Sequence, residues 1–187
     1  HAWAELASAG AELAGVCDAM PEKAAAAARK FGVPGFSSVE EMLDKTNPDL
    51  VDVITRMDTH RDICAMLADR KIAAIVQKPL APSWEDCVAI AETARAKGVF
   101  LAVHENFRFQ SPMLKVKALL DEGRIGEINW ARLAFRTGFD VFGNQPYLLN
   151  EERLVILDVG IHVLDLARVF LGEAVRVSCE TQKRNPR

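Results

Sequence analysis

The sequence predicts an α/β protein, with a doubly wound parallel sheet followed by part of an α+β domain whose sheet is mainly antiparallel. Short apolar runs rich in Val and Ile recur along the first part of the chain, with amphipathic helical segments between them. That alternation is typical of parallel crossover units. After about residue 106 it ends, and a long, partly alternating run follows. The chain has 187 residues, enough for two small domains, so we expect domains over 1–106 and 107–187.

The elements of the first domain follow from this alternation and from helix-start signals. Ser38 with Glu41, and Ser83 with Asp86, can each form a capping box at the start of a helix. The strands are expected at 12–17, 50–55, 72–77 and 99–104, and the helices at 21–31, 38–45, 59–70 and 83–97.

The second domain is expected to begin with a helix at 111–122, which ends at the turn glycines Gly123 and Gly126. A long strand over 127–137, a loop around 143–147, a helix over 156–170 and a strand over 174–180 complete it. The first nine residues resemble the tail of an Ala-rich helix without a start signal. We therefore expect further protein before and after this sequence.

Composition narrows the function classes. Half of the residues are hydrophobic, 26% are charged and the net charge is −3. This balance is that of a soluble globular protein, and it suggests neither a nucleic acid nor a membrane as partner. No apolar run approaches the roughly 20 residues that span a bilayer. The four cysteines are scattered, which favours a reduced, cytoplasmic protein without a structural metal site.

Polar residues follow the predicted parallel strands at their carboxyl ends, where ligands bind in open α/β sheets. Asp18 follows the first strand, and an acidic residue there binds the adenosine ribose in Rossmann-type domains and favours NAD over NADP. Thr55 and His60 follow the next strand and Lys78 the one after. The alternatives are a turn aspartate at Asp18, a loop threonine, a helix-start histidine and a surface lysine. The glycine fingerprint G-x-G-x-x-G does not occur in this sequence.

The helix expected at 156–170 carries Asp158, His162 and Asp165 within an otherwise apolar run. Residues three or four apart lie on one face of an α-helix, so the three form a stripe. Asp158 as an N-cap and His162 as a core imidazole are the alternatives.

Six segments occur in an order and spacing that resemble one family along the whole chain. The chain is similar to the glucose-fructose oxidoreductase/inositol dehydrogenase/MocA family of NAD(P)-dependent oxidoreductases, in which a Rossmann domain precedes an α/β domain that often mediates oligomerisation. The segments are "VCDAMPEKAAAAARKFGVP" (16–34), "VDVITRMDTH" (51–60), "VQKPLA" (76–81), "HENFRF" (104–109), "LLDEGRIGEI" (119–128) and "ILDVGIHVLDLARVFLG" (156–172).

The resemblance implies a role for each matched residue. By this resemblance His162 would be the general base, a role for which histidine is the commonest side chain, Asp158 would orient its imidazole, and Lys78 would stabilise the developing alkoxide. These three and Arg108 bind the substrate. The cofactor-binding residues that it implies are Asp18, Thr55, His60, Gln77, Lys78 and Asn106.

The implied function is NAD-dependent hydride transfer to or from a hydroxyl carbon of a sugar, polyol or cyclitol, with NADP less favoured, in a homo-oligomer built on the second sheet. The "HENFRF" segment resembles pentose-type sugar dehydrogenases of the family. Two alternatives are an NAD-dependent glycoside hydrolase and a non-catalytic dinucleotide-binding subunit, which would have no need of Lys78, Asp158 and His162. The sequence departs from the family pattern at Gln77, where glutamate is usual, and at Arg56, where proline is usual.

Overall fold

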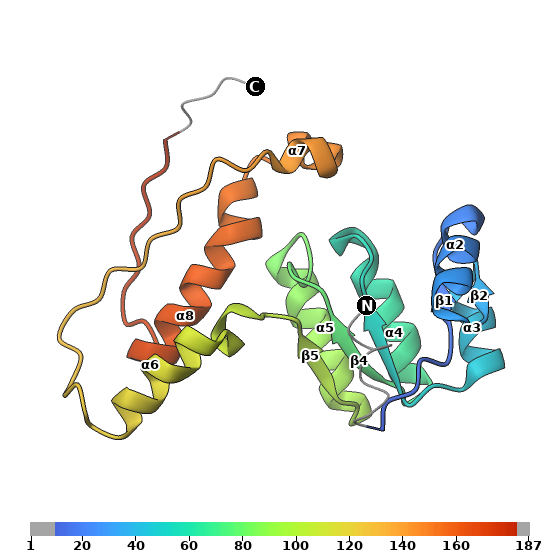
Figure 1. Ribbon diagram of the computed structural model, residues 1–187, viewed down its shortest axis with the longest axis horizontal. Helices are drawn as coiled ribbons and strands as arrows, with labels where there is room; N and C mark the ends of the chain where they lie inside the picture. The colour runs from blue at the N-terminus through green and yellow to red at the C-terminus, as the bar shows by residue number, and fades with distance from the viewer. Residues whose placement is uncertain (1–9, 183–187) are drawn as a thin grey trace. The chain divides into compact units, whose positions relative to one another are not determined.

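The computed structural model describes residues 10–182, and they form two compact units (Figure 1). One unit comprises 10–76 with 81–102, and the other comprises 77–80 with 103–182. The helix tail expected over residues 1–9 lies outside the described residues.

The first unit contains the predicted parallel sheet, in two parts. Strand β1 (Val16–Cys17) pairs in parallel with β2 (Gly35–Phe36). Strand β3 (Leu50–Val53) pairs in parallel with β4 (Ala73–Val76), and β5 (Leu101–Val103) lies on the other side of β4. The four predicted strands are confirmed, although each is shorter than expected, and β2 was not predicted. The α/β fold class is therefore confirmed.

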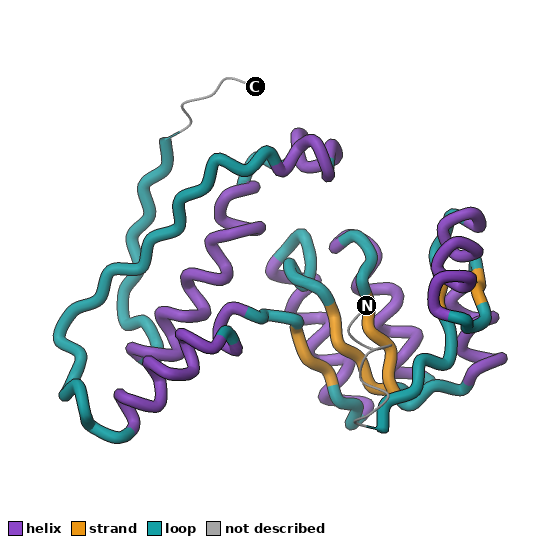
Figure 2. Tube along the Cα trace, viewed as in Figure 1, coloured by secondary structure: helices purple, strands orange, loops and turns teal. Residues whose placement is uncertain are grey.

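Helices alternate with these strands along the chain (Figure 2). They are α2 (Pro21–Phe31), α3 (Val39–Thr46), α4 (His60–Asp69) and α5 (Trp84–Lys97). Both predicted caps form, because Ser38 Oγ accepts from the Glu41 amide at 3.2 Å and Ser83 Oγ accepts from the Asp86 amide at 3.1 Å. Helices α4 and α5 pack together, and the buried apolar residues include Val53, Leu67, Ala74, Val76 and Ile90.

The second unit contains α6 (Ser111–Asp121), α7 (Val141–Asn144) and α8 (Ile161–Leu171). The continuous α-helix expected over 156–170 is wrong in its first part, because Val155–Gly160 forms a π-helical turn that leads into α8. A Cβ on Gly160 would lie 3.3 Å from the carbonyl oxygen of Val155, so the absence of a side chain suits this wide turn. None of the helices within residues 10–182 is long and apolar enough to cross a membrane.

The antiparallel strands predicted over 127–137 and 174–180 are wrong for this structure, since neither segment is assigned to a strand. Their apolar side chains are open to solvent, with Trp130 77% exposed and Val177 74% exposed. A strand needs a hydrogen-bonded neighbour and an apolar surface on which to lay one face. The described residues of the second unit provide neither for these two segments.

Candidate functional site

Asp18 lies directly after β1, where the sequence places it. Its amide donates to the carbonyl oxygen of Phe36 at 3.1 Å, and its Oδ1 accepts from the amide of Met20 at 2.9 Å. The side chain therefore fixes the turn into α2, as the alternative of a turn aspartate predicts. A carboxylate has two oxygens and about four acceptor positions. A turn role and a hydrogen bond to a ribose hydroxyl are thus compatible at Asp18.

Thr55 and His60 are connected by the turn between β3 and α4. Thr55 is exposed, and its hydroxyl accepts from Thr59 Oγ1 at 2.7 Å. His60 is only 1% exposed and its Nε2 lies 3.1 Å from the carbonyl oxygen of Thr55. The buried ring of His60 therefore contacts the main chain of the turn, and the side chain of Thr55 is the more accessible of the two. A cofactor contact by either residue stays a prediction.

Lys78 and Asp158, eighty residues apart in the sequence, are in direct contact in the second unit. Lys78 Nζ donates to Asp158 Oδ1 at 2.5 Å and to the main-chain oxygen of Asp158 at 2.9 Å. The two side chains are 22% and 25% exposed, so the ion pair is partly shielded from water. The peptide bond between Lys78 and Pro79 is cis. The π-helical turn thus presents both a carboxylate and a carbonyl to one ammonium.

Gln77 precedes this lysine and bonds to a different residue. Its Nε2 lies 2.5 Å from Nδ1 of His104. The amide is neutral where the family pattern has a carboxylate, so no negative charge stands beside Lys78 at this position. Gln77 therefore links the segment 77–80 to the residues that follow β5.

His162 is held by Glu105, a residue that the sequence reasoning did not single out. Nδ1 of His162 lies 2.6 Å from Glu105 Oε1, and the two side chains are 7% and 14% exposed. The imidazole also stacks on Phe107, with ring centroids 3.9 Å apart and planes inclined by 6°. The prediction that Asp158 orients His162 is wrong, because Asp158 binds Lys78 and Glu105 binds the imidazole. Glu105 lies in the "HENFRF" segment (104–109), next to the predicted Asn106. That position in the sequence could have indicated that Glu105 belongs to the site.

Arg108 and Asp165 form a third pair. Arg108 Nε donates to Asp165 Oδ2 at 2.8 Å, and its Nη2 donates to Oδ1 of the same carboxylate. Hydrogen bonding to Asp165 raises the pKa of the Arg108 guanidinium. This pair joins the turn Phe107–Phe109 to α8, while Asn106, just before that turn, is exposed. Substrate binding by Arg108 and cofactor binding by Asn106 stay predictions.

The arrangement suits proton transfer and charge stabilisation better than thiol chemistry. Burial raises the pKa of the Cys64 thiol to about 11 and also raises the pKa values of the Cys17 and Cys87 thiols. A thiol with a raised pKa is a poor nucleophile near neutral pH. The ammonium of Lys78 and the imidazole of His162, each with a carboxylate partner, are the more reactive groups.

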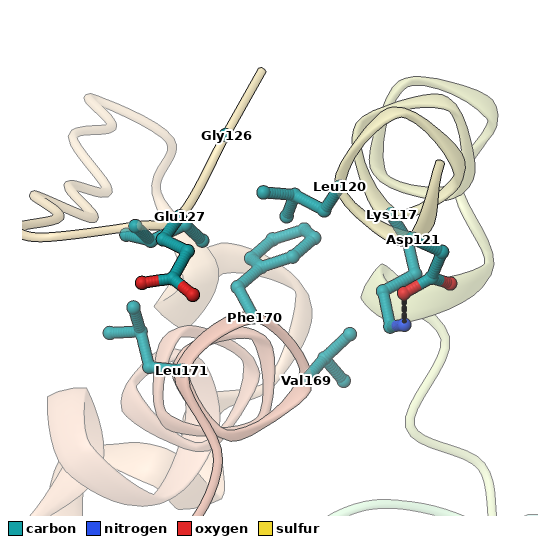
Figure 3. Close-up of a pocket in the computed structure, with 9 residues that line it drawn as sticks. Lys117, Leu120, Asp121, Gly126, Glu127, Val169, Phe170 and Leu171 are labelled. Carbon is teal, nitrogen blue, oxygen red and sulfur yellow. Dashed lines mark hydrogen bonds and ion pairs between the residues drawn. The ribbon is translucent and has the colours of Figure 1, made fainter. Parts of the chain in front are cut away.

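A separate groove of about 330 Å³ lies near the carboxyl end of α8 and includes none of the predicted site residues (Figure 3). The Lys117–Asp121 ion pair lies at one side of it, and the ring of Phe170 lies between the side chains of Leu120 and Leu171. Its lining residues are Lys117, Leu120, Asp121, Gly126, Glu127, Ile128, Val169, Phe170 and Leu171.

Comparisons with known proteins show which proteins the chain is similar to. The chain is 40% identical to a D-apiose dehydrogenase from Rhizobium rhizogenes, over all of this chain and 54% of that protein. It is 39% identical to a D-apiose dehydrogenase from Paraburkholderia graminis, over 99% of this chain and 49% of that protein. The chain thus spans about half the length of these curated relatives.

A crystal structure of an oxidoreductase from Agrobacterium radiobacter, in complex with NAD⁺, L-tartaric acid and magnesium, superposes with a TM-score of 0.94. It is 41% identical, and the match covers all of this chain and 54% of that one.

Two family models match the chain in succession. Residues 1–105 match the model of an oxidoreductase family with an NAD-binding Rossmann fold, and residues 113–187 match the GFO/IDH/MocA C-terminal domain. The first match alone covers more than half of the sequence. The chain therefore belongs to the glucose-fructose oxidoreductase/inositol dehydrogenase/MocA family.

Proposed function

We propose that this chain carries the catalytic residues of an NAD-dependent dehydrogenase that oxidises a hydroxyl carbon of a sugar, polyol or cyclitol. The observation that carries the proposal is the presence of two hydrogen-bonded pairs, Lys78–Asp158 and His162–Glu105, in one unit of a family member. In this proposal residues 1–106 belong to the dinucleotide-binding domain and residues 107–187 begin the substrate domain. A subunit that only binds a dinucleotide would need neither pair.

Asp18, at the end of β1, can bind the ribose of a dinucleotide. Asp18 is partly accessible, and Oδ2 of its carboxylate accepts none of the hydrogen bonds that hold the turn to Met20. We assign it to the adenosine ribose, with Thr55 of the same unit as a further cofactor contact. NAD, when bound, supplies the acceptor for the hydride that leaves the substrate carbon.

His162 is assigned the hydroxyl proton. An ionised carboxylate only accepts hydrogen bonds, so Nδ1 carries the proton in the neutral imidazole that is bonded to Glu105. The other nitrogen, Nε2, then has the lone pair that a general base requires. As the substrate hydroxyl becomes a carbonyl, its proton moves to His162 Nε2.

Lys78 is assigned the charge that develops on the substrate oxygen. An ammonium group has three N–H donors, and the structure directs two of them to Asp158. The third can donate to the substrate oxygen and stabilise its negative charge during proton removal. Asp158 thereby orients Lys78.

D-apiose is the first substrate to test, because the two D-apiose dehydrogenases are 40% and 39% identical over nearly the whole chain. The natural protein that contains this sequence is mixed with NAD and with D-apiose, myo-inositol or a glycoside, and NADH absorbance is followed. We expect NADH to accumulate with a free sugar or polyol. Release of an aglycone without net NADH would instead indicate a hydrolase, and NAD binding without turnover of any substrate would contradict the proposal.

Lys78→Met should reduce kcat by about 10² or more, in the range found when a group that stabilises an oxyanion is removed. Lys117→Met is the matched control, because Lys117 forms an exposed pair with Asp121 on α6 and none of the predicted site residues lies in that groove. Equal activity of the two variants would remove Lys78 from the mechanism.

A further inference from the structure

The imidazole of His162 is fixed at two points by residues of one short segment. Glu105 Oε1 lies 2.6 Å from its Nδ1, and the same oxygen accepts from the amide of Phe107 at 3.2 Å. The Phe107 ring lies parallel to the imidazole, 3.9 Å away between centroids. The carboxylate therefore selects a ring nitrogen, and the aromatic ring fixes the plane.

Asp158, the carboxylate that the resemblance paired with His162, is bound by Lys78. Oδ1 and the main-chain oxygen of Asp158 both accept hydrogen bonds from Lys78 Nζ. Asp158 lies within the π-helical turn Val155–Gly160, whereas His162 is the second residue of α8, which follows that turn. In a π-helix the hydrogen bonds run from i to i+5, so residues four apart do not align as they do on an α-helix.

We propose that Glu105 is the positioning residue that holds His162 as the Nδ1–H tautomer and so leaves Nε2 as the proton acceptor. The proposal rests on the proposed function for its catalytic consequence, while the tautomer itself is a property of the protein without substrate. Phe107 contributes in two ways: its ring stacks on the imidazole, and its amide donates a hydrogen bond to the carboxylate of Glu105. Together, Glu105 and Phe107 hold His162 so that only Nε2 of its imidazole can accept a proton.

The test begins with the nitrogen-15 NMR shifts of the His162 side chain, recorded at a pH where the imidazole is neutral. In the unmodified protein we expect Nδ1 to carry the proton. In Glu105→Gln the amide can accept from Nδ1–H or donate to an unprotonated Nδ1, so the two tautomers should both be populated. Glu105→Asp keeps an acceptor without a competing donor and should restore the Nδ1–H form.

The matched control is Glu173→Gln. Glu173 pairs with Arg168 near the other end of α8 and is largely exposed, so the same chemical change there should leave the tautomer and the turnover unchanged. In the active protein, Glu105→Gln should lower kcat at least about tenfold with a smaller change in KM, since a histidine in the wrong tautomer cannot take the proton.

The outcomes separate the two claims. A neutral His162 that carries its proton on Nε2 in the unmodified protein would overturn the assignment of Glu105, whether or not any variant folds. An Nδ1–H tautomer that persists unchanged in Glu105→Gln would overturn it as well. A tautomer that depends on Glu105 in a protein that oxidises no sugar or polyol would support the positioning role and contradict the proposed function.

Discussion

At the scale of single residues, Lys78 and His162 contact different carboxylates, Asp158 and Glu105, and the two contacts have different chemical consequences. The Lys78–Asp158 pair joins two charged groups, whereas the carboxylate of Glu105 faces an imidazole that is neutral before it takes a proton. In the proposed mechanism His162 accepts the substrate proton, and the resulting imidazolium would lie 2.6 Å from the carboxylate of Glu105. Glu105 can therefore stabilise the product of proton transfer as well as the tautomer that begins it.

His162→Ala should lower kcat by roughly 10² to 10⁴, which is the usual contribution of a general base. The Kd of NAD, measured by calorimetry, should change little, because His162 has no assigned contact with the ribose or phosphates. Adding Glu105→Gln to His162→Ala should cost almost nothing further, since Glu105 acts through the imidazole. Losses in kcat that add in full would contradict that dependence.

Asp18→Ser should reduce the preference for NAD over NADP, measured as the ratio of the two kcat/KM values. A carboxylate accepts from the ribose 2′-hydroxyl and repels a 2′-phosphate, whereas serine does neither strongly. The hydroxyl of serine can still accept from the Met20 amide, which preserves the turn into α2. Better use of NADP than of NAD by the unmodified protein would contradict the assignment of Asp18.

At the scale of elements, local signals were sufficient for the helices of the first unit and for α6 of the second, and they located four strands, but they were insufficient for β2 and for most of the second unit after α6. Helix α2 has the predicted bounds, and α5 begins one residue later than expected, because capping and glycine signals act within a few residues. The two-residue strand β2 has no pattern of its own, since its pairing with β1 alone makes it a strand. The local sequence likewise did not predict the π-helical turn or the absence of a strand over 127–137.

The same limit applies to the candidate site. Residue types and motif order led to Lys78, Asp158 and His162, yet the role that the resemblance implied for Asp158 gave it a different partner from the one in the structure. The contact between Glu105 and His162 spans 57 residues, and nothing in the local sequence of either residue encodes it. The sequence therefore led to residues that lie in one unit of the structure, but it did not predict the contacts that each of them makes.

Gly35→Ala should destabilise the first unit by about 1 to 3 kcal/mol, the usual cost of overpacking. A Cβ at residue 35 would lie 2.8 Å from the Cβ of Ala28 and 2.9 Å from the carbonyl oxygen of Ala24, so α2 would have to move away from β2. Gly138→Ala is the matched control, because a Cβ there meets nothing within 4 Å, and it should be neutral or stabilising by at most about 1 kcal/mol. Urea unfolding gives both values, and equal stabilities for the two variants would show that α2 and β2 do not pack this closely.

At the scale of the whole molecule, cofactor binding and catalysis are assigned to different residues, so they should separate in a stability measurement. A ligand that binds only the folded protein stabilises it by about 2.7 kcal/mol at a concentration one hundred times its Kd. We expect NAD to raise the Tm of the natural protein in this way, and NADP at the same concentration to raise it less, because a carboxylate assigned to the ribose would repel the 2′-phosphate.

The variants then distinguish binding from chemistry in the same experiment. Asp18→Ser should diminish the rise in Tm with NAD, since it removes a ribose contact and increases the Kd. His162→Ala should keep the full rise while it abolishes most of the turnover, because the imidazole is assigned only the substrate proton. A rise that is lost in His162→Ala and kept in Asp18→Ser would reverse the two assignments, and it would place the dinucleotide against α8 instead of the end of β1.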